Sequence, residues 1–218
     1  MRFVPLQIAG LFVSFLISRA SAGSRLKPYS TAFFFWSSST PEPTAAAAMV
    51  KLESASAERN KDPLWKVLER RALSQYPLKV DAPLRVLEVA AGAGVHTHHF
   101  SKQLHAASKP FCWYPTDPDE TSRASQQAYV SEEPSITASV ESPLQLTLDE
   151  HGIIEMDTDA KLEGSSMDWI ININMIHISP WAATLGLMKI AGEKLKPGGI
   201  LFLYGPYREG GTCVESNM

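Results

Sequence analysis

The stretch LRVLEVAAGAGVHTHHF, which runs from Leu84 to Phe100, decides the fold of this chain. Its first part, residues 84–89, is largely apolar and rich in branched side chains, which is typical of a buried strand in a parallel sheet. Small residues follow at 91–94, and a helical apolar spacing begins at Val95. A strand, a glycine turn and a helix in this order form the start of a nucleotide-binding α/β unit.

The spacing of the glycines indicates which nucleotide fits. The dinucleotide fingerprint requires glycine or alanine five positions after its first glycine, and from Gly92 that position holds Thr97. This disfavours an NAD-dependent oxidoreductase. Glu88 lies four residues before Gly92 inside an apolar strand, where a carboxylate is costly without a partner. The pattern E-x-x-x-G-x-G resembles motif I of class I S-adenosylmethionine (SAM) methyltransferases. The alternative is a strand–turn–helix unit that binds no ligand.

Composition narrows the class of protein. The chain has 218 residues and a net charge of −3, so it lacks the basic surface expected of a nucleic-acid-binding protein. About 170 residues remain after the N-terminal segment, which is enough for one domain with its own core. The two cysteines, Cys112 and Cys213, are too few for a disulfide framework or a C-x-x-C metal site.

Residues 1–48 have the composition of a leader and a linker. No acidic residue precedes Glu42, and the apolar run from Phe3 to Ile17 is too short to span a bilayer. Ala20-Ser21-Ala22 resembles a signal cleavage site, so we expect either a signal peptide cut after Ala22 or a plastid or mitochondrial transit peptide. Alternatively Met49 is the true start, and the protein is then cytoplasmic. In either case we expect residues 49–218 to form the domain.

Strands and helices alternate along this domain. We expect helices from about Asp62, over 119–131 and over 181–196, and strands at 84–89, 111–114, 167–175 and 200–204. Residues 132–165 give a weak signal, with a strand at 136–140 or 144–148 and a loop after His151. Alternation of this kind predicts a parallel α/β sheet, whose ligands bind at the carboxyl ends of the strands. Glu88, Asp117, Asn174, His177 and Tyr204 all lie at or just after such ends.

Two polar segments each have two interpretations. Asp117 follows the second strand about 20 residues after the glycines, where a carboxylate often accepts hydrogen bonds from ribose hydroxyls. Alternatively Asp117 or Asp119 caps the helix that follows. Arg59-Asn60-Lys61 precedes the first predicted helix and is either a polar capping segment or a flap that reaches the ligand.

Six motifs together resemble the methyltransferase-like 26 family, whose members are class I methyltransferase-like proteins of unknown substrate. The resemblance covers residues 56–217. The motifs are AERNKDP, VLEVAAGAGVHTHHF, WYPTDPDE, INMIHISPW, LKPGGILFLYGPYREGG and the closing SN.

This resemblance implies a Rossmann-like class I methyltransferase sheet that binds SAM. It implies that the methionine and ribose end of the ligand is lined by Glu88, Ala90, Gly92 and Gly94, and that the ribose is held by Asp117. It also implies that the pocket wall at the fourth strand consists of Asn174, Met175 and His177, and that the cover from the N-terminal side consists of Arg59, Asn60 and Lys61.

The chain departs from the family in two places. The acid expected near adenine after the third strand is not evident, although Thr147 or Asp149 could occupy its place. The family also continues through two more strands, whereas this chain stops at Met218. We therefore expect a sheet that is incomplete after its fifth strand, with an open edge at 200–204.

Methyl transfer requires alignment of the acceptor and exclusion of water, and it needs a general base only if the acceptor loses a proton. His177 is the candidate base, unless it is simply a hydrogen-bonded residue at a strand end. His96 is expected at a helix N-terminus beside the cofactor, where the helix dipole favours its neutral form. No third ligand accompanies His96 and His99, so we expect no metal. Two functions remain: an enzyme acting on a small molecule or a protein, or a non-catalytic SAM-binding or interaction protein.

Overall fold

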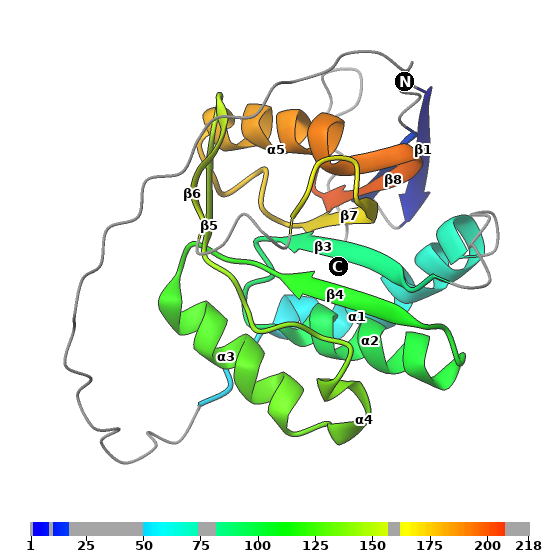
Figure 1. Cartoon of the computed structure of the whole chain (residues 1–218). Helices are drawn as coiled ribbons and strands as arrows, with labels where there is room; N and C mark the ends of the chain where they lie inside the picture. The colour runs from blue at the N-terminus through cyan, green and yellow to red at the C-terminus, as the bar shows by residue number, and fades with distance from the viewer. Residues whose placement is uncertain (1, 9–10, 18–49, 74–81, 157–161, 208–218) are drawn as a thin grey trace, which may run out of the picture.

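The structure of this chain is a computed structural model, in which residues 2–8, 11–17, 50–73, 82–156 and 162–207 are described. Four parallel strands in the order β4-β3-β7-β8 form the centre of one sheet, and an antiparallel hairpin of β1 and β2 continues it beyond β8 (Figure 1). The strands are β1 (Arg2–Ile8), β2 (Leu11–Ile17), β3 (Leu84–Val89), β4 (Phe111–Pro115), β7 (Met167–Ile173) and β8 (Leu195–Gly205).

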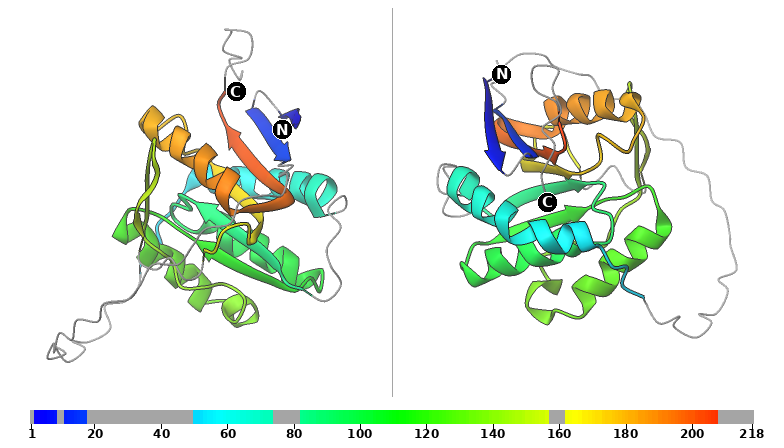
Figure 2. Two further views of the ribbon diagram at one scale, coloured as in Figure 1. Left: turned by 45° about the horizontal axis from the view of Figure 1, so that its top comes forward. Right: turned by 180° about the vertical axis from the view of Figure 1, so that it is seen from behind.

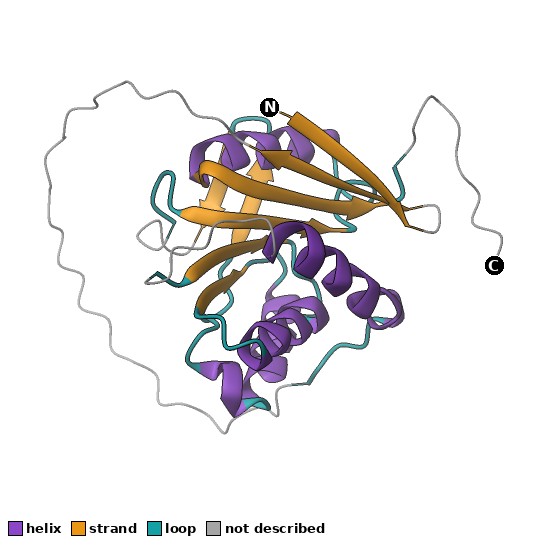
Figure 3. Ribbon diagram, turned by 90° about the vertical axis from the view of Figure 1, so that its right-hand side faces the viewer, coloured by secondary structure: helices purple, strands orange, loops and turns teal. Residues whose placement is uncertain are grey.

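Helices cover both faces of the sheet (Figure 3). The helix α5 packs on one face together with a separate hairpin of β5 and β6, and the other described helices lie on the opposite face. The elements are α1 (Ala55–Leu68), a π-helical turn η1 (Glu69–Leu73), α2 (Val95–Ala106), α3 (Glu120–Ser131), α4 (Pro134–Thr137), β5 (Leu146–Asp149), β6 (Gly152–Met156) and α5 (Trp181–Lys194).

The alternation of side chains along β3 divides the core into two halves. Leu84 and Val86 pack with Phe100 of α2, whereas Leu87 and Val89 pack on the opposite face with the cluster that includes α5. Successive residues of a strand point to opposite faces, so Glu88 shares the face of Leu84 and Val86. The sheet therefore carries a carboxylate into the apolar layer under α2.

The predicted Rossmann-like fold is confirmed, but several boundaries differ. The first helix begins at Ala55 rather than Asp62, because the hydroxyl of Ser54 accepts a hydrogen bond from the N–H of Ala57 and caps the helix. Pro63 consequently lies inside α1 instead of in its first turn. The predicted buried face of this helix is correct, since Leu64, Val67 and Leu68 are all in the core.

The weakly patterned segment after α3 folds differently from the expectation. Residues 134–137 form the short helix α4. The strand predicted at 144–148 overlaps the observed strand β5 only at residues 146–148. Part of the predicted loop after His151 is the strand β6. Thr147 and Asp149 lie in β5, and neither lines the cavity described below, so the structure does not support their predicted place near adenine.

The edge of β8 is not open. Residues 12–17 of β2 pair antiparallel with residues 200–205 of β8, as the left view of Figure 2 shows. The expectation of an open edge at 200–204 is therefore wrong, because residues 2–8 and 11–17 of the predicted leader pair within the sheet. The pairing satisfies backbone N–H and C=O groups that an edge strand would otherwise leave without partners.

Candidate functional site

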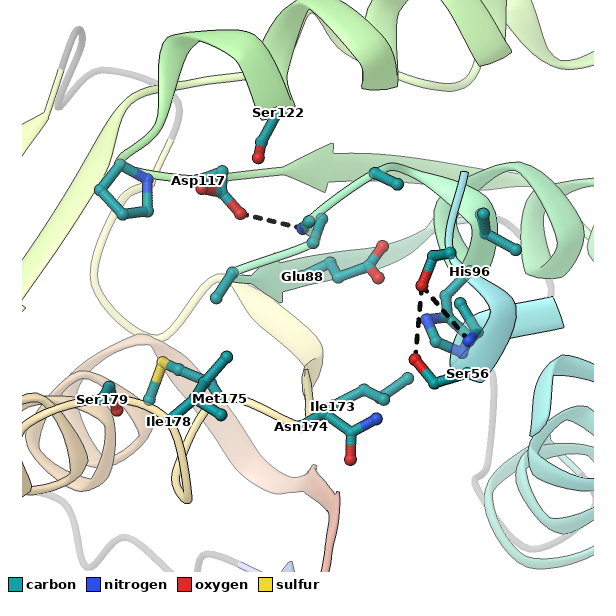
Figure 4. A pocket seen from close by; sticks show the side chains of 18 residues that line it. Ser56, Glu88, His96, Asp117, Ser122, Ile173, Asn174, Met175, Ile178 and Ser179 are labelled. Carbon is teal, nitrogen blue, oxygen red and sulfur yellow. Dashed lines mark hydrogen bonds between the residues drawn. The ribbon is translucent and has the colours of Figure 1, made fainter. Parts of the chain in front are cut away.

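A cavity of about 460 Å³ lies at the carboxyl ends of β3, β4 and β7 (Figure 4). The first residues of α1, α2 and α3 and the turn before α5 complete its wall. The lining residues are Ser54, Ser56, Ala57, Glu88, Ala90, Ala91, Gly92, Ala93, Val95, His96, Asp117, Pro118, Ser122, Ile173, Asn174, Met175, Ile178 and Ser179. Helix N-termini present N–H groups that have no partner within their helix, so this wall offers hydrogen-bond donors to a ligand.

Glu88 is the most deeply buried acid of the cavity, with 2% of its surface exposed. Its Oε2 accepts a hydrogen bond of 2.6 Å from the hydroxyl of Thr97 and one of 2.8 Å from the indole N–H of Trp113. Burial raises the pKa of the Glu88 carboxyl to about 7, although these two hydrogen bonds oppose the rise. A cation that entered the cavity beside Glu88 would stabilise its ionised form.

The glycine turn after β3 is strained at one position and open at another. Ala90 has a φ of 55° and Gly92 a φ of 57°, both in the left-handed region that favours glycine. A Cβ added at Gly92 would meet no atom within 4 Å, so this residue faces open space in the cavity. The turn thus leaves room for a ligand to approach its backbone.

Gly94 has a different purpose from Gly92. A Cβ at Gly94 would lie 2.7 Å from the backbone Cα of Gln126 in α3, so a side chain there would clash with the packing of two helices. The side-chain amide of Gln126 also donates a hydrogen bond of 2.9 Å to the carbonyl of Gly92, which fixes the turn. Gly94 does not line the cavity, in contrast to the expectation for it.

Asp117 stands at the end of β4 and closes the cavity opposite the turn. Its two carboxylate oxygens accept hydrogen bonds from the backbone N–H of Gly92 at 2.9 Å and of Asp119 at 3.0 Å. Burial raises the pKa of Asp117, while these backbone hydrogen bonds act in the opposite direction. Asp119, not Asp117, caps α3, since its Oδ2 accepts from the N–H of Ser122 at 2.7 Å. Each oxygen of Asp117 keeps a lone pair that a ligand hydroxyl can use.

His96 lies in the first turn of α2 and is buried. Its Nε2 lies 2.7 Å from Oδ1 of Asn60 in α1, and Asn60 also hydrogen-bonds the hydroxyl of Tyr204 in β8. Burial lowers the pKa of His96 to about 4, helped by His99 and Lys61 nearby. The imidazole is therefore neutral, and it donates from Nε2 to the amide oxygen of Asn60.

The residues expected to contact a ligand divide into two groups. Seven of them line the cavity together: Glu88, Ala90, Gly92, His96, Asp117, Asn174 and Met175. Arg59, Asn60 and Lys61 instead form the second turn of α1, where Arg59 is exposed and Lys61 pairs with Glu58. They do not line the cavity, and Asn60 reaches it only through His96. His177 is exposed in the turn after β7 and is not part of the cavity wall.

Several lining residues were not anticipated from the sequence. Ser54, Ser56 and Ala57 bring the start of α1 to the cavity, and Ile178 and Ser179 bring the turn before α5. Ser54 had a usable signal, because serine is preferred at helix N-caps. Asn174 has a φ of 61°, and its backbone N–H donates to the carbonyl of Tyr204 at 2.8 Å, so the chain after β7 turns sharply into the site.

The charge of the wall limits what it can bind. None of the cavity-lining residues is lysine or arginine, and the ionisable groups are Glu88, Asp117 and the neutral His96. Within the described ranges, no cluster of histidine, cysteine or acidic side chains is arranged to hold a metal ion. No described helix is long and apolar enough to cross a membrane.

A family profile described as "Protein of unknown function (DUF938)" matches residues 51–218. The chain belongs to this family. The match contains every cavity-lining residue and every parallel strand of the sheet. The region that defines the DUF938 family therefore contains the whole site, but the description of the family names no activity.

Solved structures with the same fold include carbon methyltransferases. The DszA carbon methyltransferase is 22% identical with a TM-score of 0.52, and the alignment covers 72% of this chain and 38% of that one. The CurJ carbon methyltransferase is 23% identical with a TM-score of 0.52, and the alignment covers 72% of this chain and 37% of that one. The CMeT domain of the citrinin polyketide synthase is 21% identical with a TM-score of 0.52, covering 68% of this chain and 35% of that one. This DUF938 chain thus shares their fold and spans less than two fifths of each.

Proposed function

We propose that this DUF938 protein is a SAM-dependent methyltransferase that resembles the methyltransferase-like 26 family and methylates a small molecule or a protein. The observation that carries the proposal is the open face of Gly92, flanked by two buried acids. Glu88 and Asp117 lie on either side of the turn, and nothing fills the space in front of it.

The residues of the cavity suit the parts of SAM. Glu88 is placed to attract the cationic methionine end, and Asp117 offers free lone pairs to the ribose hydroxyls. The apolar side chains of Ile173 and Met175 offer a surface for the flat or uncharged parts of the ligand. When bound, SAM would supply a methyl group from its sulfonium ion to the lone pair of the acceptor, with S-adenosylhomocysteine as the leaving group.

The chain's own residues would then align the acceptor and exclude water. The tightly held pair of Asn60 and His96 keeps one wall rigid, which favours a fixed distance between acceptor and methyl group. The predicted base His177 is exposed beside the cavity, so it would act only on an acceptor that extends out to the turn after β7. A nucleophile that carries no proton to be removed needs no base at all.

The second candidate is a non-catalytic SAM-binding or interaction protein. The observation that favours it is that His96, the histidine of the cavity wall, has its pKa lowered to about 4 and is a weak base at neutral pH. No lysine or arginine of the wall offers an alternative.

Transfer of a labelled methyl group separates the two candidates. The purified chain is incubated with methyl-labelled SAM and a cell extract fractionated by size, and label is counted in small-molecule and protein fractions. An enzyme transfers label, and Glu88→Gln reduces the transfer. SAM binding without any transfer to either fraction would favour the non-catalytic protein.

A further inference from the structure

Three large apolar side chains are exposed between the cavity-lining turn after β7 and the first two turns of α5. Ile178 is 77% exposed in the turn after β7, Trp181 is 67% exposed at the start of α5, and Leu185 is 43% exposed one turn later. We call these three residues the apolar rim. Trp181 and Leu185 are four residues apart on a helix and therefore share one face. Exposed apolar patches rimmed by polar residues mark protein–protein interaction sites or ligand-binding grooves.

The apolar rim meets the cavity at Ile178. Ile178 belongs to both, because it lines the cavity beside Met175 and Ser179 and is also largely exposed (Figure 4). The backbone N–H of Ile178 donates to the carbonyl of Met175 at 3.0 Å, which fixes the turn that joins the two surfaces. A molecule that spans from the rim into the cavity would stay in contact with protein along its whole length.

The volume of the cavity and the charge of its wall indicate which class of acceptor fits. Cavities that bind small molecules measure about 300–1,000 Å³, and this one, at 460 Å³, is at the lower end. A nucleoside-containing cofactor leaves little further room inside, so the body of an acceptor must rest outside. The acids Glu88 and Asp117 with no lysine or arginine in the wall disfavour an anionic acceptor.

We propose that the apolar rim binds the aromatic or aliphatic body of a neutral or cationic small-molecule acceptor, whose nucleophile enters the cavity past Ile178. This inference rests on the proposed methyltransferase function and names its substrate class. Trp181 provides a broad flat surface on which a ring can stack, and it is the anchor expected to contribute most to binding. Ile178 and Leu185 extend the contact on either side.

Two naphthalene probes, one neutral and one anionic, test this assignment. Binding of 2-naphthol, which is neutral at pH 7, and of the anion 2-naphthoate is measured by calorimetry with the full chain, with and without saturating S-adenosylhomocysteine. We expect 2-naphthol to bind, to bind more tightly when the cofactor product is present, and to bind more tightly than 2-naphthoate. Trp181→Ala should weaken 2-naphthol binding about tenfold, as expected for loss of an aromatic anchor.

Val50→Ala is the matched control, because Val50 is 72% exposed and lies outside the cavity wall. Ile178→Ser is a second rim variant, and circular dichroism verifies that each variant is folded. Equal affinity for the two probes, or an unchanged affinity for 2-naphthol in both rim variants, would overturn the inference. If S-adenosylhomocysteine still binds in that case, the proposed function is unaffected. If S-adenosylhomocysteine does not bind to the folded chain, the proposed function fails, and the assignment of the rim to an acceptor fails with it.

Discussion

A single oxygen of Glu88 accepts hydrogen bonds from both Thr97 and Trp113, at 2.6 Å and 2.8 Å. Thr97 is the residue that breaks the dinucleotide fingerprint, and its hydroxyl is used here to hold the acid of the adjacent strand. Trp113 comes from the neighbouring strand β4 and Thr97 from the helix α2, so the acid is held by one strand of the sheet and by the helix that covers it. This arrangement holds a carboxylate in the core at the end of β3, where it faces the cavity.

The raised pKa of Glu88 makes the stability of the protein depend on pH. Because the pKa is raised from 4.5 to about 7 in the folded state, the contribution of this group is fully present below pH 4.5 and is lost as pH rises to about 7. The loss corresponds to about 3 kcal/mol at the conversion of 1.36 kcal/mol per unit. We expect Glu88→Gln, which preserves an acceptor oxygen for Thr97 and Trp113, to raise the Tm at pH 8 but not at pH 4.5. Thermal unfolding followed by circular dichroism measures both values.

The same group predicts pH-dependent cofactor binding. SAM carries positive charge, so its affinity should rise as pH increases through about 7 and Glu88 loses its proton. Calorimetry at pH 6 and pH 8 measures the change, and Glu88→Gln should abolish the difference between the two. A pH dependence that persists in this variant would show that another group is responsible.

Ala90 occupies a backbone conformation that favours glycine. Its φ of 55° predicts that Ala90→Gly stabilises the protein by about 0.5–1 kcal/mol in urea unfolding, because the left-handed region is costly for a residue with a Cβ. Ala91→Gly is the control, since Ala91 is adjacent but does not have a positive φ. The control should be destabilised, and stabilisation of both variants would contradict the strain at Ala90.

His96 should remain neutral over the physiological pH range. With its pKa lowered to about 4, its contribution to stability is present above pH 6.5 and is lost as pH falls toward 4. NMR titration of the imidazole should show no protonation between pH 5.5 and 8. Asn60→Leu removes the acceptor of its Nε2 and should cost about 1–3 kcal/mol of stability, the typical penalty for a buried donor left unpaired.

The pairing of β2 with β8 makes the N-terminal residues part of the sheet. Ser14 pairs with Leu203 in the middle of the ladder, so Ser14→Pro, which removes a backbone donor and is tolerated only at sheet edges, should lower the Tm, whereas Ser14→Ala should not. Equal Tm values for the two variants would contradict the pairing. Cleavage after Ala22, as proposed for a targeting leader, would instead remove β1 and β2 from the sheet. The N-terminal sequence of the protein isolated from cells shows whether this cleavage occurs.

The central site could be predicted from the sequence because its signals are local. Glu88, Gly92 and Asp117 each lie in a strand or in the turn directly after one, and the structure brings them to one cavity. The start of α1 was missed although serine at position 54 is a usable cap signal. The segment before the helix is also held by a distant contact, in which the hydroxyl of Ser125 in α3 accepts from the N–H of Leu52. No pattern within residues 50–62 reveals that contact.

Other features could not be predicted because they depend on the fold as a whole. The partner of the β8 edge lies about 190 residues away in the sequence, and its apolar residues resemble a leader segment equally well. The exposure of Trp181 was also hidden, since an apolar residue in a helix is ordinarily assigned to the core. His177 was favoured by its place after a strand, but the turn that follows β7 directs it to solvent.

The most direct test of the account is calorimetric titration of SAM into the full chain and into Gly92→Asn. Asparagine tolerates a positive φ, so this variant places a side chain in the open space at Gly92 with little backbone strain. Gly198→Asn is the matched control, because Gly198 has a φ of 84° and open space around it but lies outside the cavity. We expect the unaltered chain and the control to bind SAM with micromolar affinity and Gly92→Asn to lose at least tenfold. Equal binding by all three proteins, or none by the folded chain, would contradict the proposed cofactor site.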